Sequence, residues 1–488
     1  MVADLLSRIK EIRLIQGGMG AGVSNWRLAR AVSSSGRGLG VVSGVALGNI
    51  VARRLEEGDT EMRDAILKFP DGRISEEIIN TYFVPAGKRD PTQPYKPFPF
   101  PNPKADSNKN VTLPRRLEGL IVASTFAEVS LAKQGHDNPV GINLLYKIEW
   151  PTLPALYGAM LAGVDAVLIG AGLPRTIPEV LDGLSRNQPV FMDATVTNGE
   201  NYRFHFDPKN IIDAPIELER PTFLAIVNGH LAARGVSKAD GYIVEGPNAG
   251  GHNAPARSKA LTESGEPDFG EKDNLNLEAF QKFLTKNQGE KRLPEQQPYW
   301  FAGGYANRLS EARQLGAQGV QVGTPFAFSY ESGIPLDAKK ELIGLIMKGC
   351  RVFTDPLASP SGFPFKVIPM PGSLSDVRIY EGRARRGCNI GHLAEIVEID
   401  ETLTMRCPGE PIKDYVRKGG KEEETIGRTC LCNALVSTIG LGSPGEPPIY
   451  TSGKDHEDVI TLVKESLENT GELVYPASKV IDYILRNQ

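Results

Sequence analysis

The chain has 488 residues, and its 55 Lys and Arg against 59 Asp and Glu give a formal net charge of −4. Without a basic excess it lacks the electrostatic signature of nucleic-acid binding, and no apolar run is long enough to span a membrane. Five cysteines in a chain of this length do not make a disulfide scaffold. Because the N-terminal residues also lack a signal peptide's apolar centre, we expect a cytoplasmic enzyme.

Short apolar runs predict eight buried parallel strands. In chain order they are "IRLIQ" ending at Gln16, "LGVVSG" ending at Gly44, "PVGINLL" ending at Leu145, "VDAVLIG" ending at Gly170, "PVFMDA" ending at Ala194, "GYIVEG" ending at Gly246, "YWFAGG" ending at Gly304 and "GVQVGT" ending at Thr324. Helix-length segments separate most of them, at 152–162, 175–184, 224–234 and 310–315.

Strand alternating with helix eight times predicts an α/β fold, the (β/α)8 or TIM barrel. The alternative is an open doubly wound sheet. It is less favoured because the first strand is followed by "QGGMGAG" rather than by a GxGxxG turn, a long helix and an acidic residue about 20 positions on.

Three segments are additional to the strands and helices that a (β/α)8 barrel requires. We predict a barrel over residues 1–348 with insertions at about 49–115 and 196–220, and a C-terminal lobe over 349–488 that packs on the barrel. The first insertion contains a proline-rich stretch that predicts an extended surface segment, covering the barrel or reaching a partner subunit. Within the lobe, "ASPSGFPFKV" at 358–367 is compatible with a turn over the barrel mouth and equally with a plain linker.

Glycines gather where several predicted strands end, which is the functional face of such a barrel. They let the backbone adopt positive φ and approach a ligand closely, and their N–H groups can form an anion nest. Because the last two strands of a barrel often hold a phosphate, Gly303, Gly304, Gly323 and Thr324 are the predicted phosphate cradle. The alternative is that these glycines only make tight turns.

The motifs "IQGGMG", "EGPNAGGHNAPAR", "FAGGYAN" and "GVQVGTPF", in this order, resemble the nitronate monooxygenase family, formerly called 2-nitropropane dioxygenases. The same superfamily includes flavin-dependent enoyl-ACP reductases. The resemblance covers about residues 10–335 and implies an FMN-binding barrel. It implies that FMN is bound by the turn Gln16, Gly17, Gly18 and Met19, by Asn143, by Glu245, Gly250 and Gly251, and by the cradle Gly303, Gly304, Gly323 and Thr324.

The resemblance also places His252 at the family's active-site histidine. With an unperturbed pKa near ~6.5, histidine can transfer a proton or stabilise an anion beside the flavin. The alternative is a surface-loop histidine without a role. Glu245 could equally hold the loop, and we assign it no catalytic role. The other five histidines and Trp26 are predicted to be structural or solvated.

Cys388, Cys407, Cys430 and Cys432 follow the spacing C-x18-C-x22-C-x-C, which fits neither common zinc nor iron–sulfur patterns. We therefore predict free cysteines and no metal site.

The expected activity is FMN-dependent oxidation of alkyl nitronates with oxygen, with His252 as base or anion stabiliser. Two alternatives remain: NAD(P)H-dependent reduction of an enoyl thioester, with NAD(P)H or an acyl carrier as partner, and a phosphate-binding barrel without redox chemistry. A homo-oligomer is expected.

Overall fold

The computed structural model describes residues 8–213, 216–291, 296–383 and 385–486. Eight parallel strands form one sheet in the order β1-β13-β12-β11-β10-β6-β5-β2. An isolated parallel bridge between Ile15 and Leu39 joins the two end strands, and the N–H of Gln16 donates to the carbonyl of Leu39 at 2.9 Å. The sheet thus closes into the predicted (β/α)8 barrel. Its strands are β1 (Leu14–Gln16), β2 (Gly40–Ser43), β5 (Val140–Leu145), β6 (Ala166–Gly170), β10 (Thr222–Val227), β11 (Gly241–Glu245), β12 (Tyr299–Ala302) and β13 (Gly319–Val322).

The prediction of the fifth strand was wrong. The run "PVFMDA" forms β7 (Val190–Asp193), which pairs with β9 (Arg203–Phe206) in a separate sheet of order β3-β4-β9-β7. The segment 224–234, predicted as a helix, instead supplies β10 and then the short helix α9 (His230–Gly235). β7 alternates buried and exposed residues, the pattern of a strand with one solvated face. β10 is a short continuous apolar run, which periodicity alone cannot distinguish from a helix.

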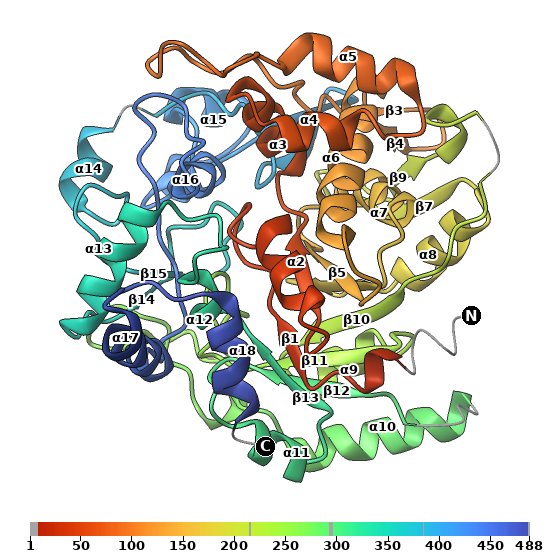
Figure 1. Ribbon diagram of the computed structural model, residues 1–488. Helices are drawn as coiled ribbons and strands as arrows, with labels where there is room; N and C mark the ends of the chain where they lie inside the picture. The colour runs from red at the N-terminus through yellow and green to blue at the C-terminus, as the bar shows by residue number, and fades with distance from the viewer. Residues whose placement is uncertain (1–7, 214–215, 292–295, 384, 487–488) are drawn as a thin grey trace.

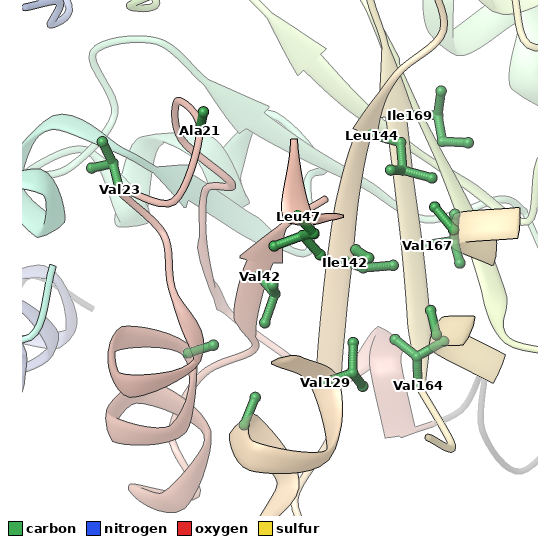
Figure 2. Close-up of a cluster of buried hydrophobic side chains, with 14 of the residues drawn as sticks. Ala21, Val23, Val42, Leu47, Val129, Ile142, Leu144, Val164, Val167 and Ile169 are labelled. Carbon is green, nitrogen blue, oxygen red and sulfur yellow. The ribbon is translucent and has the colours of Figure 1, made fainter. Parts of the chain in front are cut away.

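Residues along the barrel strands alternate between two hydrophobic clusters. One fills the barrel interior and includes Ile15, Val41, Leu168, Leu224, Ile243 and Trp300. The other lies between strands and helices and includes Val42, Ile142, Leu144, Val167 and Ile169. Figure 2 shows side chains of this outer set beside Val129 of helix α6. Two buried faces on each strand explain the nearly continuous apolar runs of the sequence.

Helices surround the barrel. They are α2 (Trp26–Ser34), α6 (Arg115–Lys133), α7 (Thr152–Leu161), α8 (Ile177–Ser185), α10 (Leu277–Lys291), α11 (Leu309–Gln314), α12 (Thr324–Ala327) and α13 (Leu336–Met347). α2 begins at Trp26 because Asn25 accepts a hydrogen bond from the N–H of Leu28 at 3.0 Å. Trp26 is fully buried in the outer cluster, as expected for a core residue.

The first insertion folds into α3 (Leu47–Glu56), α4 (Thr60–Ile66) and α5 (Gly72–Tyr82), which gather with α6 at one end of the molecule (Figure 1). Residues 83–103 contain no helix or strand and return along α3, where Tyr95 donates to Glu57 at 2.7 Å. The extended part therefore covers its own insertion. Strands β3 (Lys104–Ala105), β4 (Asn110–Thr112) and β8 (Val196–Thr197), and the 3-10 turn Pro208–Asn210, complete the two insertions.

Residues after 349 form β14 (Phe353–Asp355), β15 (Phe365–Val367), α14 (Val377–Gly382), β16 (Glu395–Ile399), β17 (Thr402–Arg406), α15 (Ile412–Arg417), α16 (Leu431–Thr438), α17 (Glu457–Thr470) and α18 (Ala477–Leu485). β16 pairs with β8 of the second insertion, and α18 lies beside α2 (Figure 1). The region is thus in contact with the barrel through several elements, while its predicted boundary at 348–349 stays a prediction. Within the described ranges, no helix is long and apolar enough to cross a membrane.

Candidate active site at the barrel mouth

One cavity of about 460 Å³ lies at the carboxyl ends of the strands. Twelve of the thirteen residues predicted for the site line it: Gly17, Gly18, Met19, Asn143, Glu245, Gly250, Gly251, His252, Gly303, Gly304, Gly323 and Thr324. They come from five different strand ends, which only the closed barrel brings together. Ligand sites of this fold occupy the same position.

Gln16 is the residue that does not line the cavity. Its side chain is fully buried, donates from Nε2 to Ser24 Oγ at 2.9 Å and accepts from the N–H of Val41 at 2.9 Å. Ser24 in turn donates to the carbonyl of Gly17 at 2.9 Å. Gln16 therefore fixes the turn below the cavity.

Gly18 packs directly against Asn143, where an added Cβ would lie 2.3 Å from the Cβ of Asn143. The amide of Asn143 donates to the carbonyls of Leu144 and Leu168 at 3.1 and 3.0 Å. Only glycine permits this contact, so the first and third strand ends meet without a gap.

The predicted cradle has two different turns. Gly303 and Gly304 follow β12 with φ of +84° and +88°, a conformation that side chains disfavour. A Cβ on Gly304 would meet only the amide nitrogen of Asn248, at 3.9 Å, so the space beside it is open. Gly323 differs: its φ is −111°, and a Cβ there would lie 3.3 Å from the sulfur of Met19. Positive φ is thus required after β12 but not after β13.

The loop that carries His252 leaves β11 and is held by two segments from the C-terminal region. On one side, Lys366 N–H donates to the carbonyl of Gly251 at 2.9 Å and Asn253 N–H donates to Pro364. On the other side, Gly251 N–H donates to Thr451 Oγ1 at 2.8 Å. The segment 358–367 therefore returns to the barrel mouth beside His252.

The imidazole of His252 is buried among protein groups that favour its neutral form. Nε2 lies 2.7 Å from Ser359 Oγ, and the ring packs edge-on against Phe365 at 4.9 Å. Burial, reinforced by the nearby Lys147, lowers the pKa of His252 well below its usual value. A neutral imidazole has one ring nitrogen that donates and one that accepts.

Glu245 ends β11 and lines the same cavity. Burial raises the pKa of its carboxyl group to about 7, opposed by the charge of Lys366. Burial lowers the pKa of Lys366 to about 7, and its ammonium donates to the carbonyl of Pro247 at 2.6 Å and to Asn253 Oδ1. Lys366 thereby ties β15 to the His252 loop.

Residues of the C-terminal region that the sequence did not indicate also reach the cavity. His392, expected to be structural or solvated, lines it, packs edge-on against Trp150 at 4.8 Å and has its pKa lowered by burial to about 4. Thr451 and Gly453 also line it, and Gly453 N–H donates to Thr324 Oγ1 at 2.9 Å. No local motif marks these residues, because their roles depend on contacts across the chain.

The other four histidines do not line the cavity. His136 contacts the carbonyl of Ala132 at 2.9 Å, His205 stacks on Phe191 at 4.8 Å, His230 begins α9, and His456 contacts Ser452 Oγ at 2.7 Å.

Cys432 lines the cavity, whereas Cys407 is buried and shares a hydrogen bond with Cys388 that lowers the pKa of Cys388. Over the described part of the chain, no group of three or more His, Cys, Asp or Glu is arranged to hold a metal ion.

Comparisons with solved structures return matches that span nearly the whole chain at low sequence identity. FabK from Thermotoga maritima is 18% identical, with a TM-score of 0.45 over 100% of this chain and 94% of that one. Nitroalkane oxidase from Streptomyces ansochromogenes is 14% identical, with a TM-score of 0.42 over 98% and 95%. The enoyl reductase domain of MlnA from Bacillus amyloliquefaciens is 11% identical, with a TM-score of 0.46 over 99% and 97%.

Protein-family models and curated protein sequences give no match to the chain.

Proposed function

We propose that the protein is an FMN-dependent oxidoreductase that oxidises alkyl nitronates with oxygen. The observation that carries the proposal is the convergence, on one cavity at the barrel mouth, of the glycine turns after β12 and β13 with His252. Phosphate binding between the last two strands is common in this fold. The motifs that make these turns are those that resemble nitronate monooxygenases.

The residues present fit a flavin mononucleotide. Gly304 leaves open space where a side chain would stand, and its φ of +88° suits glycine alone. The phosphate would be held by Gly303, Gly304, Gly323 and Thr324, and the ring system by the Gly17, Gly18 and Met19 turn and Asn143. When bound, FMN would supply the redox chemistry.

The chain's own groups would bind and orient the nitronate. A neutral His252 can donate a hydrogen bond to an oxygen of the substrate, where negative charge is stabilised. The low pKa of His252 keeps this imidazole uncharged at neutral pH. Phe328, Phe363 and Phe365 line the cavity and would exclude water from the alkyl group.

A second activity, reduction of an enoyl thioester with NAD(P)H, is favoured by one feature. The C-terminal region adds the apolar side chains of Leu393, Leu435 and Ile449 to the cavity wall. An extended apolar wall suits an acyl chain better than a short nitroalkane. The loaded acyl carrier would then be the partner.

Two measurements test these proposals. Heat release and mass determination of the chromophore should identify FMN, because no adenosine-binding unit is evident among the described residues. FAD would contradict FMN as the cofactor, and no flavin even after reconstitution would favour the phosphate-binding barrel without redox chemistry. Anaerobic mixing with an alkyl nitronate, NADH and NADPH in parallel should bleach the flavin absorbance with the nitronate. Bleaching by NAD(P)H alone would support the enoyl reductase instead.

A further inference from the structure

Three hydrogen bonds connect the cavity histidine with a lysine on a different strand end. Ser359 Oγ lies 2.7 Å from Nε2 of His252, and the hydroxyl oxygens of Ser359 and Ser361 are 2.8 Å apart. The ammonium group of Lys147 donates to Ser361 Oγ at 3.2 Å. Ser359 is fully buried, while Ser361 and Lys147 are half-buried, so the series runs from the cavity toward solvent.

The donors and acceptors fix the direction of this series. A charged lysine can only donate, so Ser361 accepts from Lys147 and has its single hydroxyl proton left for Ser359. Ser359 then donates its own proton to Nε2 of His252. The neutral imidazole must therefore carry its proton on Nδ1.

We propose that Lys147, Ser361 and Ser359 form a hydrogen-bond relay that sets the tautomer of His252 and so keeps its donor proton on Nδ1. The proposal rests on the proposed function, in which His252 acts on the substrate.

Lys147 is suited to this task by its surroundings. Its ammonium lies 4.2 Å from the ring centre of Phe363. Burial lowers the pKa of Lys147 to about 7, so the lysine is charged, and the direction of the series is fixed, below that pH. Lys147 is the charged group that acts on His252. Lys366, next to Phe365, interacts instead with Glu245, Glu266 and Lys454.

The test reads the imidazole directly, without turnover. In flavin-loaded protein labelled with ¹⁵N-histidine, two-bond ¹H–¹⁵N spectra at about pH 6, where Lys147 is charged, should show His252 as the Nδ1–H tautomer, assigned by the loss of its signals in His252→Gln. In Lys147→Met the direction of the series is lost, so both tautomers should appear although Lys147 does not touch the imidazole. The pKa of His252 should rise because a nearby positive charge is removed.

In Ser359→Ala both tautomers of His252 should likewise appear, and kcat should fall by about tenfold. If Ser359→Ala does not fold, Ser361→Ala, at a half-buried site, replaces it. Ser375→Ala is the matched control, because it breaks a serine pair of the same kind, with oxygens 2.6 Å apart, away from the cavity. Lys88→Met, which removes a lysine over Tyr95 at 3.6 Å, controls for the lysine.

Unchanged His252 signals in Lys147→Met and in the serine variants would overturn the relay. The same holds for a wild-type protein that shows the Nε2–H tautomer. Failure of the proposed function would look different: the tautomer would respond as described, but neither nitronate nor enoyl thioester would be turned over.

Discussion

The two halves of the cavity are held in place by different means. The turn after β12 is determined locally, because Gly303 and Gly304 adopt φ values that other residues disfavour. The His252 loop is determined from a distance, by hydrogen bonds to Pro364, Lys366 and Thr451. A turn that requires positive φ can be predicted from its glycines, whereas hydrogen bonds from residues far along the chain cannot be predicted from a local motif. Substitutions should therefore affect cofactor binding on one side and catalysis on the other.

The largest effect should follow from His252→Ala. We expect flavin content to stay near that of the wild type, because the predicted phosphate turns lie on other strands, while kcat falls by about 10²–10⁴-fold, the usual contribution of a general acid or base. Stopped-flow flavin reduction with the true substrate measures this. A rate within a factor of about two of wild type would make the histidine a bystander. Since the pKa of His252 is lowered, activity should show no histidine ionisation between pH 6.5 and 8.

Gly304→Val should act on the opposite half. A side chain at φ +88° costs about 1–3 kcal/mol, and it would enter the space predicted for the phosphate, so the Kd for FMN should rise by about tenfold or more. Gly471→Val is the control, because Gly471 has φ +74° at the end of α17, with no atom within 4 Å of an added Cβ. Equal flavin affinity in both variants of folded protein would remove the cradle from the site.

Much of the fold, and the locally determined half of the cavity, could be predicted from the sequence. The apolar runs predicted the barrel and seven of its eight strands, and glycine at the strand ends indicated where Gly303 and Gly304 lie. β10 was missed because a six-residue apolar run fits a strand and a helix equally. Lys147 and Thr451 could not be found, since their spacing from His252 in the chain carries no period or motif. Ser359 was indicated only as part of the segment 358–367, for which a plain linker was an equal alternative.

Glu245→Gln should change stability in a pH-dependent way. Burial raises the pKa of Glu245 to about 7 in the folded protein, from about 4.5 in an unfolded chain. The folded state therefore binds more protons than the unfolded state between these values, and stability falls as pH rises from about 4.5 to 7. In the wild type, the titration of Glu245 should lower the free energy of unfolding by about 1–2 kcal/mol between pH 5 and pH 7.5. Glu245→Gln has no carboxyl group to titrate there, so this decrease should be absent in the variant. Urea unfolding at both pH values measures this. Glu263→Gln, at an exposed position, should leave the slope unchanged; an identical slope in Glu245→Gln would place the carboxyl group in water.

Thr451→Ala should have the smallest effect. It removes the hydroxyl that accepts from the N–H of Gly251, one hydrogen bond of about 1 kcal/mol. We expect a modest loss of stability and a fall in kcat of a few fold, with flavin affinity unchanged, because only the His252 half is loosened. Thr451→Ser, which keeps the hydroxyl, should restore both values. A loss of flavin in Thr451→Ala with normal kcat would show that Thr451 supports cofactor binding and not the His252 loop.

The attachment of the His252 loop to residues 359–366 and 451–454 has a consequence for biosynthesis. Ribosomes add about 5–20 residues per second, so the last barrel strand, which ends at Val322, leaves the ribosome several seconds before Thr451 is made. During that interval the barrel can close around its core while the histidine loop lacks its outer partners. Catalytic competence would then arise only once residues 451–454 have been made. A nascent chain released before that point would contain the histidine and every glycine motif but not the contacts that hold the His252 loop.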